Sequence, residues 1–122
     1  MKICCGTDII EVDRIKRAIE KNGTKFIQKI FTEGEIDYCE SKSKLKYQHY
    51  AARFAAKEAV YKAISKIIKR DYSWQDIEIV NEPSGKPIAN LKFDRGSIID
   101  IDVSLSHIEK YATATAVITY EN

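Results

Sequence analysis

The segment 53–64 is the feature that most constrains how this chain can fold. Its apolar residues recur with helical spacing, so we expect a long helix over about 46–69. At about 100° per residue, this helix carries a stripe of apolar side chains. The stripe consists of Tyr47, Tyr50, Phe54, Tyr61 and Ile68. Glu58 falls inside it, and a carboxylate on a core-facing stripe is costly unless a cation meets it. The sequence therefore predicts a lysine or a metal ion beside Glu58.

Length and composition limit the possible classes of protein. The 122 residues are enough for one core but not for two, so we expect a single domain over 1–122. No apolar run has the length of a membrane span, and the first residues lack a signal-peptide pattern. Three cysteines without a disulfide or zinc-site spacing predict a reducing, cytoplasmic location. A net charge of +2 is too small to indicate nucleic-acid binding.

The order of the expected elements indicates an α+β fold. A strand is expected over 2–11, and three short helices precede the long one. Asp13 is the expected N-cap of the first helix. The third helix follows the capping-box pattern of Thr32 and Glu35. After Asp71 the apolar residues alternate as they do in strands. Four strands are expected there, at about 77–79, 88–93, 98–106 and 111–120.

Asp8 is a second carboxylate on an apolar surface. In the first strand it has the parity of Cys4 and Ile10. Paired carboxylates suit Mg²⁺ when the ion also holds a phosphate-bearing substrate. The alternative is that Glu58 pairs with Lys62 four residues further along the helix, and that Asp8 caps a local turn. Periodicity alone leaves both interpretations open.

Basic residues form two further candidate groups. Beside a metal site, Arg53, Lys57 and Lys62 would hold phosphate oxygens, together with lysines such as Lys44 in the link before the helix. The alternative is a solvated helix face.

The second basic group lies on the first short helix. Arg14, Arg17 and Lys21 fall within roughly 60° of arc there, and Ile15 and Ile19 point elsewhere. This stripe would fit an acidic helix of a partner protein, and a plain solvated face is the alternative.

His107 ends one of the predicted strands, on the same face as Ile99 and Val103. A structural histidine with satisfied hydrogen bonds is the simpler interpretation, and a functional one is the alternative. The chain has no Ser/His/Asp order and no Gly-rich phosphate loop.

Taken together, the ordered motifs resemble a known family over nearly the whole chain. Segment 6–15 resembles the pattern G-x-D-[IL]-x-x-x-x-R-[IVL], and segment 53–63 resembles [RW]-F-[AS]-x-K-E-A-x-x-K-A. Segments 74–79, 85–87 and 105–107 follow in the expected order. These motifs are similar to those of the holo-[acyl-carrier-protein] synthases, the small type of 4′-phosphopantetheinyl transferase. The resemblance implies the fold of that family.

The resemblance also implies a reaction. Coenzyme A would donate its 4′-phosphopantetheine arm to a serine of apo acyl carrier protein, in fatty acid biosynthesis. Asp8 and Glu58 match the family's Mg²⁺ ligands, and with Lys62 they would form the catalytic group. Residues that would bind coenzyme A are Lys44, Arg53, Lys57, Lys62, Pro87 and His107. Arg14 matches a contact to the carrier protein, which Arg17 and Lys21 extend by geometry.

Small members of the family are homotrimers with sites between subunits, so the resemblance implies the same assembly here. Segment 65–71 departs from the family, because it replaces a Gly-Thr-Gly-like stretch. Two other functions stay open. One is a carrier-binding module without activity. The other is a transferase for peptide or polyketide synthases, although those enzymes resemble two fused copies of this fold.

Overall fold

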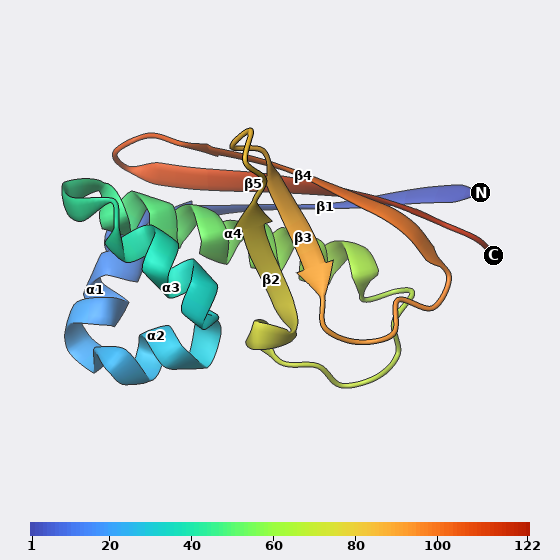
Figure 1. Ribbon diagram of the computed structural model, residues 1–122, viewed down its shortest axis with the longest axis horizontal. Helices are drawn as coiled ribbons and strands as arrows, with labels where there is room; N and C mark the ends of the chain where they lie inside the picture. Colours follow the sequence, from blue (N-terminus) through green and yellow to red (C-terminus); the bar gives the residue numbers. More distant parts are fainter.

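A computed structural model describes residues 1–122 and contains helices and antiparallel sheets, as Figure 1 shows. The elements are β1 (Lys2–Glu11), α1 (Val12–Asn22), α2 (Thr24–Ile30), α3 (Glu33–Glu40), η1 (Ser43–Leu45), α4 (Lys46–Ile64), η2 (Trp74–Asp76), β2 (Ile77–Asn81), β3 (Pro87–Leu91), β4 (Ile98–His107) and β5 (Tyr111–Tyr120). The expected α+β class is confirmed. None of the helices combines the length and apolarity that crossing a membrane requires.

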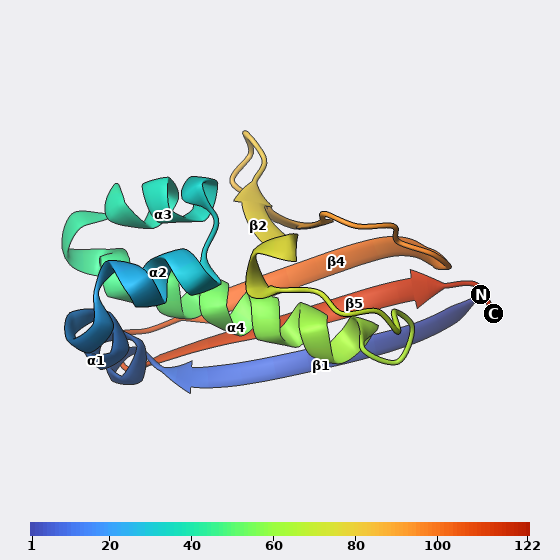
Figure 2. The same cartoon turned by 90° about the horizontal axis from the view of Figure 1, so that it is seen from below.

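A three-stranded antiparallel sheet in the order β1-β5-β4 forms the base of the fold. Figures 1 and 2 show α4 along one face of this sheet, with α1–α3 at one end of the molecule and both termini at the other. The hairpin of β2 and β3 forms a second, two-stranded sheet. The first strand and the last strand are therefore neighbours, which places the N-terminal motif beside the long helix.

Small residues allow α4 to lie close to the sheet. Alanines at positions 55, 56, 59 and 63 are buried in the core between them. Gly6 faces this row, and a Cβ at Gly6 would lie only 2.1 Å from the Ala59 carbonyl oxygen. Only glycine fits at that approach. The expected aromatic stripe is only partly correct as a description of the core face. Tyr50 and Ile68 are buried and Phe54 is half-buried, but Tyr61 is exposed.

The remaining helices close a second core around the N-terminal half of α4. Ile15, Ile19, Phe31 and Tyr50 are buried in it. The capping box at the start of α3 is confirmed, since the Thr32 and Glu35 side chains each bond to the other residue's backbone N–H.

Two boundaries differ from the sequence expectations. The helix α4 ends at Ile64 rather than near 69, and a turn follows in which the Ser65 hydroxyl donates to the Lys62 carbonyl. The helix α1 begins at Val12, so that Asp13 lies in its first turn and Glu11 is the N-cap.

A β-bulge after Ile98 shifts the parity of β4. Ile98 is 7% exposed and Ile99 is 47% exposed, so the expectation that Ile99 shares the face of Val103 was wrong. One extra residue in the strand turns the Ile99 side chain to the opposite face.

Candidate active site

Asp8 and Lys62 meet where β1 passes beneath the C-terminal half of α4. The Lys62 ammonium nitrogen lies 3.2 Å from Asp8 Oδ1 and donates to the Thr7 carbonyl at 3.0 Å. Asp8 is paired regularly with Ala114 of β5, so it lies within the strand and caps no turn. The structure therefore contradicts the interpretation in which Lys62 is the ion-pair partner of Glu58.

Glu58 lies one helical turn before Lys62 and is half-buried. Its burial raises the pKa of this carboxyl above the ordinary value, and the charge on Asp8 raises it further. Lys62 acts on the Glu58 pKa in the opposite direction. Two carboxylates that repel each other thus share one lysine, and a cation between them would relieve the repulsion.

These residues fit the donor set that Mg²⁺ requires. The ion prefers hard oxygen ligands, binds through one or two carboxylates, and keeps water and phosphate oxygens in its other positions. Asp8 and Glu58 supply two carboxylates, and the structure has no group of three or more His, Cys, Asp or Glu side chains that would form a closed metal site. With Asp8 and Glu58 as oxygen donors, water and substrate oxygens would have to fill the other positions of such an ion.

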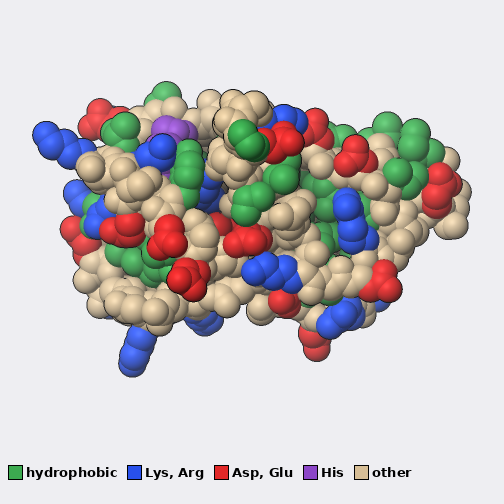
Figure 3. Space-filling view, in the orientation of Figure 1, with side chains coloured by type: hydrophobic (Ala, Val, Ile, Leu, Met, Phe, Trp, Pro, Cys, Tyr) green, Lys and Arg blue, Asp and Glu red, His purple; other side chains and the backbone are tan.

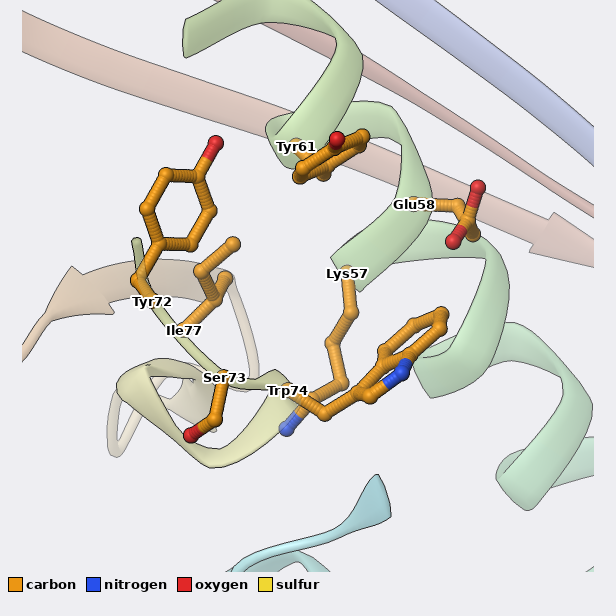
Figure 4. A pocket seen from close by; sticks show the side chains of 7 residues that line it. All are labelled: Lys57, Glu58, Tyr61, Tyr72, Ser73, Trp74 and Ile77. Atoms are coloured by element: carbon orange, nitrogen blue, oxygen red, sulfur yellow. The ribbon is translucent and has the colours of Figure 1, made fainter. Parts of the chain in front are cut away.

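An aromatic cavity of about 260 Å³ lies beside Glu58. Figure 4 shows Tyr61 and Tyr72 on one side of it, Trp74 on the other and Glu58 at its edge. The rings of Tyr61 and Tyr72 are 5.7 Å apart, and Trp74 stacks on Phe54 at 5.0 Å. The sequence did not indicate Tyr72 or Trp74 as site residues, because no periodicity links the loop before β2 to the helix.

Lys57 has a different environment from its neighbour Glu58. Its stem lines the aromatic cavity, but its ammonium points away from Glu58 (Figure 4) and lies 2.5 Å from Glu35 Oε1. Glu35 also accepts from the backbone N–H groups of Thr32 and Ile79, at 2.9 and 2.7 Å. Burial lowers the pKa of Lys57, and Glu35 opposes that shift. Both side chains are fully buried, which disagrees with the expected contact between Lys57 and coenzyme A.

Three other expected ligand residues, Arg53, Pro87 and His107, line one cavity of about 210 Å³. Arg53 is only 3% exposed, its guanidinium lies 3.9 Å from the centre of the Tyr38 ring, and it donates to Asn81. Its Nε has no hydrogen-bond partner. A buried guanidinium with an unused donor is suited to an anion. We refer to this space as the Arg53 cavity.

The histidine in this cavity ends β4, as expected. His107 Nδ1 lies 2.9 Å from Gln48 Oε1, and its ring lies 5.0 Å from that of His49. His49, Tyr38 and Asn81 also line the cavity, and they were not among the expected site residues. The helical spacing of His49 and Arg53, four residues apart, is the signal that would have found His49.

The remaining expected site residues lie elsewhere. Lys44 is exposed and lines a separate groove between η1 and the β4–β5 turn, so it does not meet Arg53. Arg14, Arg17 and Lys21 are exposed along α1, as the spacing predicted. Asp13 neutralises part of this stripe, since Arg17 Nη2 lies 2.6 Å from its carboxylate.

Comparison with known proteins decides the family. The model of the 4′-phosphopantetheinyl transferase superfamily matches residues 4–116. This chain belongs to that superfamily. Among curated relatives, the holo-[acyl-carrier-protein] synthase of Ruminiclostridium cellulolyticum is 52% identical, over 98% of this chain and 93% of the relative. That of Chloroherpeton thalassium is 44% identical, over 93% of this chain and 94% of the relative.

Solved structures of superfamily members have the same fold. The holo-[acyl-carrier-protein] synthase of Helicobacter pylori, in complex with coenzyme A, superposes with a TM-score of 0.82 at 30% identity, covering 94% of this chain and 99% of that one. The Bacillus anthracis enzyme, described as in complex with CoA (3′,5′-ADP), superposes with a TM-score of 0.78 at 34% identity, covering 97% of this chain and 96% of that one. The expected 4′-phosphopantetheinyl transferase fold is thus confirmed.

Proposed function

We propose that this chain is a holo-[acyl-carrier-protein] synthase. It transfers the 4′-phosphopantetheine group of coenzyme A to a serine of apo acyl carrier protein and releases adenosine 3′,5′-bisphosphate, in fatty acid biosynthesis. The observation that carries the proposal is the meeting of Asp8 and Lys62 beside Glu58, from segments fifty residues apart in the chain. Relatives of that name, 52% and 44% identical over nearly the whole chain, support it.

The chain's own residues divide the work of phosphoryl transfer. Asp8 and Glu58 would hold Mg²⁺, which when bound supplies positive charge to the pyrophosphate of coenzyme A. Lys62 lies against Asp8 and would stabilise negative charge on the transferring and leaving phosphates. The cavity beside Glu58 is lined largely by aromatic rings and would receive an uncharged part of the substrate.

The Arg53 cavity would bind the 3′-phosphoadenosine end of coenzyme A. Its support is the buried guanidinium with a free Nε, next to His107 and Pro87. On the exposed face of α1, Arg14, Arg17 and Lys21 would meet an acidic helix of the carrier protein.

Assembly as a homotrimer of single domains is also part of the proposal. The face of the three-stranded sheet that α4 does not cover carries Ile3 and Ile9, each 68% exposed, and Val117. Figure 3 shows apolar side chains gathered toward the end of the molecule where the termini lie. Such a surface favours burial against further copies of the chain. A mass measurement in solution tests it, and a monomer at micromolar concentration would contradict it. The cytoplasmic location stays a prediction.

The activity is tested by incubating the protein with coenzyme A, Mg²⁺ and apo acyl carrier protein, and weighing the carrier by mass spectrometry. We expect a gain of one phosphopantetheine arm. Carrier that stays unmodified, with the protein bound to it, would favour the inactive binding module. Modification of peptide synthase carriers alone would favour the broader transferase.

A further inference from the structure

The Arg53 cavity has two cationic side chains, Arg53 and Lys42, near it, and no acidic side chain neutralises them. The Arg53 guanidinium and the Lys42 ammonium both lie over the Tyr38 ring, at 3.9 and 4.5 Å from its centre. No carboxylate forms an ion pair with either cation. The polar partners in the cavity are neutral, such as Asn81. A concentration of cations without an acidic partner is suited to an anion of high charge.

Both histidines of the chain lie in this cavity. The His49 ring packs edge-on against Tyr38 at 5.5 Å and against His107 at 5.0 Å. Figure 3 shows histidine atoms at the surface beside basic side chains. Whereas His107 has Gln48 as a partner, no hydrogen bond of this structure involves the His49 ring. His49 therefore has free ring nitrogens next to a cluster of cations.

We propose that His49 is a specificity-determining residue of this cavity: it takes up one proton when a phosphate monoester dianion binds, and so favours coenzyme A over its 3′-dephospho form. The inference rests on the proposed function, which brings a 3′-phosphate monoester to this cavity. The proton comes from solvent and is added to a ring nitrogen of His49, and no bond of the ligand changes. The charged imidazole then donates to the phosphate together with Arg53.

The electrostatics of the cavity support proton uptake. Burial, His107, Arg53 and Lys42 lower the pKa of His49 to about 4, so that its ring is neutral near pH 7. These groups approach from α4, β4 and the segment after α3. Gly85 and Pro87 line the cavity from the loop between β2 and β3, and Lys86 between them is paired with Asp102 at 2.7 Å. Glu40, at the end of α3, is already held by Lys46 and Tyr50.

A bound dianion reverses this balance. Its charge outweighs the repulsion from the cations and raises the pKa of His49 in the complex. Because the bound state then holds more protons than the free state, affinity falls as pH rises from about 6.5, where the phosphate itself is already mostly dianionic. If one proton is taken up on binding, the affinity can fall by at most about tenfold for each unit of pH.

Proton NMR of the whole protein tests the proposal directly, since only two histidines contribute ring signals. The two signals are followed from pH 5.5 to 8.5 in the free protein, with coenzyme A, and with 3′-dephospho-coenzyme A. We expect the signal assigned to His49 to titrate below pH 5.5 in the free protein and above pH 6.5 with coenzyme A. With the dephospho form we expect no such change.

The matched variant is His49→Phe, which keeps an aromatic ring against Tyr38 and assigns the signal that disappears. We expect its preference for coenzyme A over the dephospho form to be independent of pH and about tenfold or more weaker than that of the unmodified protein at pH 6.5. If this variant does not fold, His107→Phe assigns the two signals in its place, and the titration of the unmodified protein still decides the matter.

The outcomes separate this inference from the proposed function. If coenzyme A binds and the His49 signal does not respond to the 3′-phosphate, the inference is wrong and the proposed function stands. If neither form of coenzyme A binds, the proposed function itself fails, and the inference fails with it.

Discussion

Lys57 and Glu58 are adjacent in α4, yet their surroundings differ completely. Lys57 is fully buried and its ammonium is held by Glu35, which is also fixed by two backbone N–H groups. Glu58 is half-buried at the edge of a cavity, and the charge on Asp8 affects its pKa more than that of any cation. One ion pair is closed and satisfied, whereas the other group is open and carries excess negative charge.

The difference indicates that the Lys57–Glu35 pair serves stability, whereas the group around Asp8 and Glu58 serves function. A closed buried pair joins α3 and β2 to α4, and its loss would leave an uncompensated charge in the core. The open group around Asp8 and Glu58 lowers stability by repulsion, and such a cost is typical of residues placed for a ligand. Four experiments test whether the two groups differ in this way.

The largest of the four effects should be a loss of stability when the buried Lys57–Glu35 pair is broken. Glu35→Ala leaves the Lys57 ammonium buried without its partner, which should lower the free energy of unfolding by about 3–5 kcal/mol. Urea unfolding followed by circular dichroism measures it. The double variant Glu35→Leu with Lys57→Met should recover much of the loss, because no charge then remains buried. A loss under about 1 kcal/mol in Glu35→Ala would show that the pair is not structural.

The second-largest effect should be a loss of transfer activity when Asp8 or Glu58 loses its charge. Glu58→Gln and Asp8→Asn keep the shape of each side chain but remove the charge that would hold Mg²⁺. We expect carrier modification to slow by about 10²- to 10³-fold or more in each, with stability unchanged or slightly increased, because the repulsion is gone. Initial rates by mass spectrometry at saturating Mg²⁺ measure this. Full activity in either variant would refute the metal assignment.

Lys62→Met should have an intermediate effect. It removes the ammonium on Asp8, and we expect the rate to fall by about 10- to 100-fold, the usual worth of a hydrogen bond to a charged group. Stability should change by less than about 1 kcal/mol, because the Lys62–Asp8 pair is partly exposed. The same rate assay and urea unfolding measure both quantities.

The matched control is Lys29→Met, which removes one exposed lysine of α2 that forms no ion pair. It should leave the transfer rate unchanged, so that a slower Lys62→Met reflects the position of the charge rather than its number. A destabilisation of several kcal/mol in Lys62→Met would place Lys62 with the closed pair instead.

The weakest response should be the pH dependence of stability. The folded-state pKa of Glu58 lies above its ordinary value of 4.5, so the folded chain binds more protons than the unfolded chain in the window above that value. Stability in this window therefore falls as pH rises, by less than about 1 kcal/mol since the side chain is partly exposed. Glu58→Gln should remove this contribution, as measured by urea unfolding from pH 4 to pH 7. An unchanged slope in the variant would show that another group causes the pH dependence.

Several elements follow from local pattern, and the structure confirms them. The strand alternation of 111–120, the capping box of Thr32 and Glu35, and the exposed stripe on α1 depend on neighbours in the sequence. The inward parity of Asp8 in β1 is also such a pattern. Predictions failed where distant contacts decide. The bulge at Ile98 depends on pairing with β5, and the true core face of α4 depends on how closely Gly6 approaches Ala59.

The amino-acid sequence was sufficient to identify the family, the order of the elements and the candidates Asp8, Glu58, Lys62, Arg53 and His107, because each lies in an ordered motif with its own spacing. Which charges meet became clear only in three dimensions. Periodicity placed Lys57, Glu58 and Lys62 on one helix, but it could not show that the first pairs with Glu35 and the last with Asp8. Those partners come from α3 and β1, and pairing across elements is set by packing rather than by spacing along the chain.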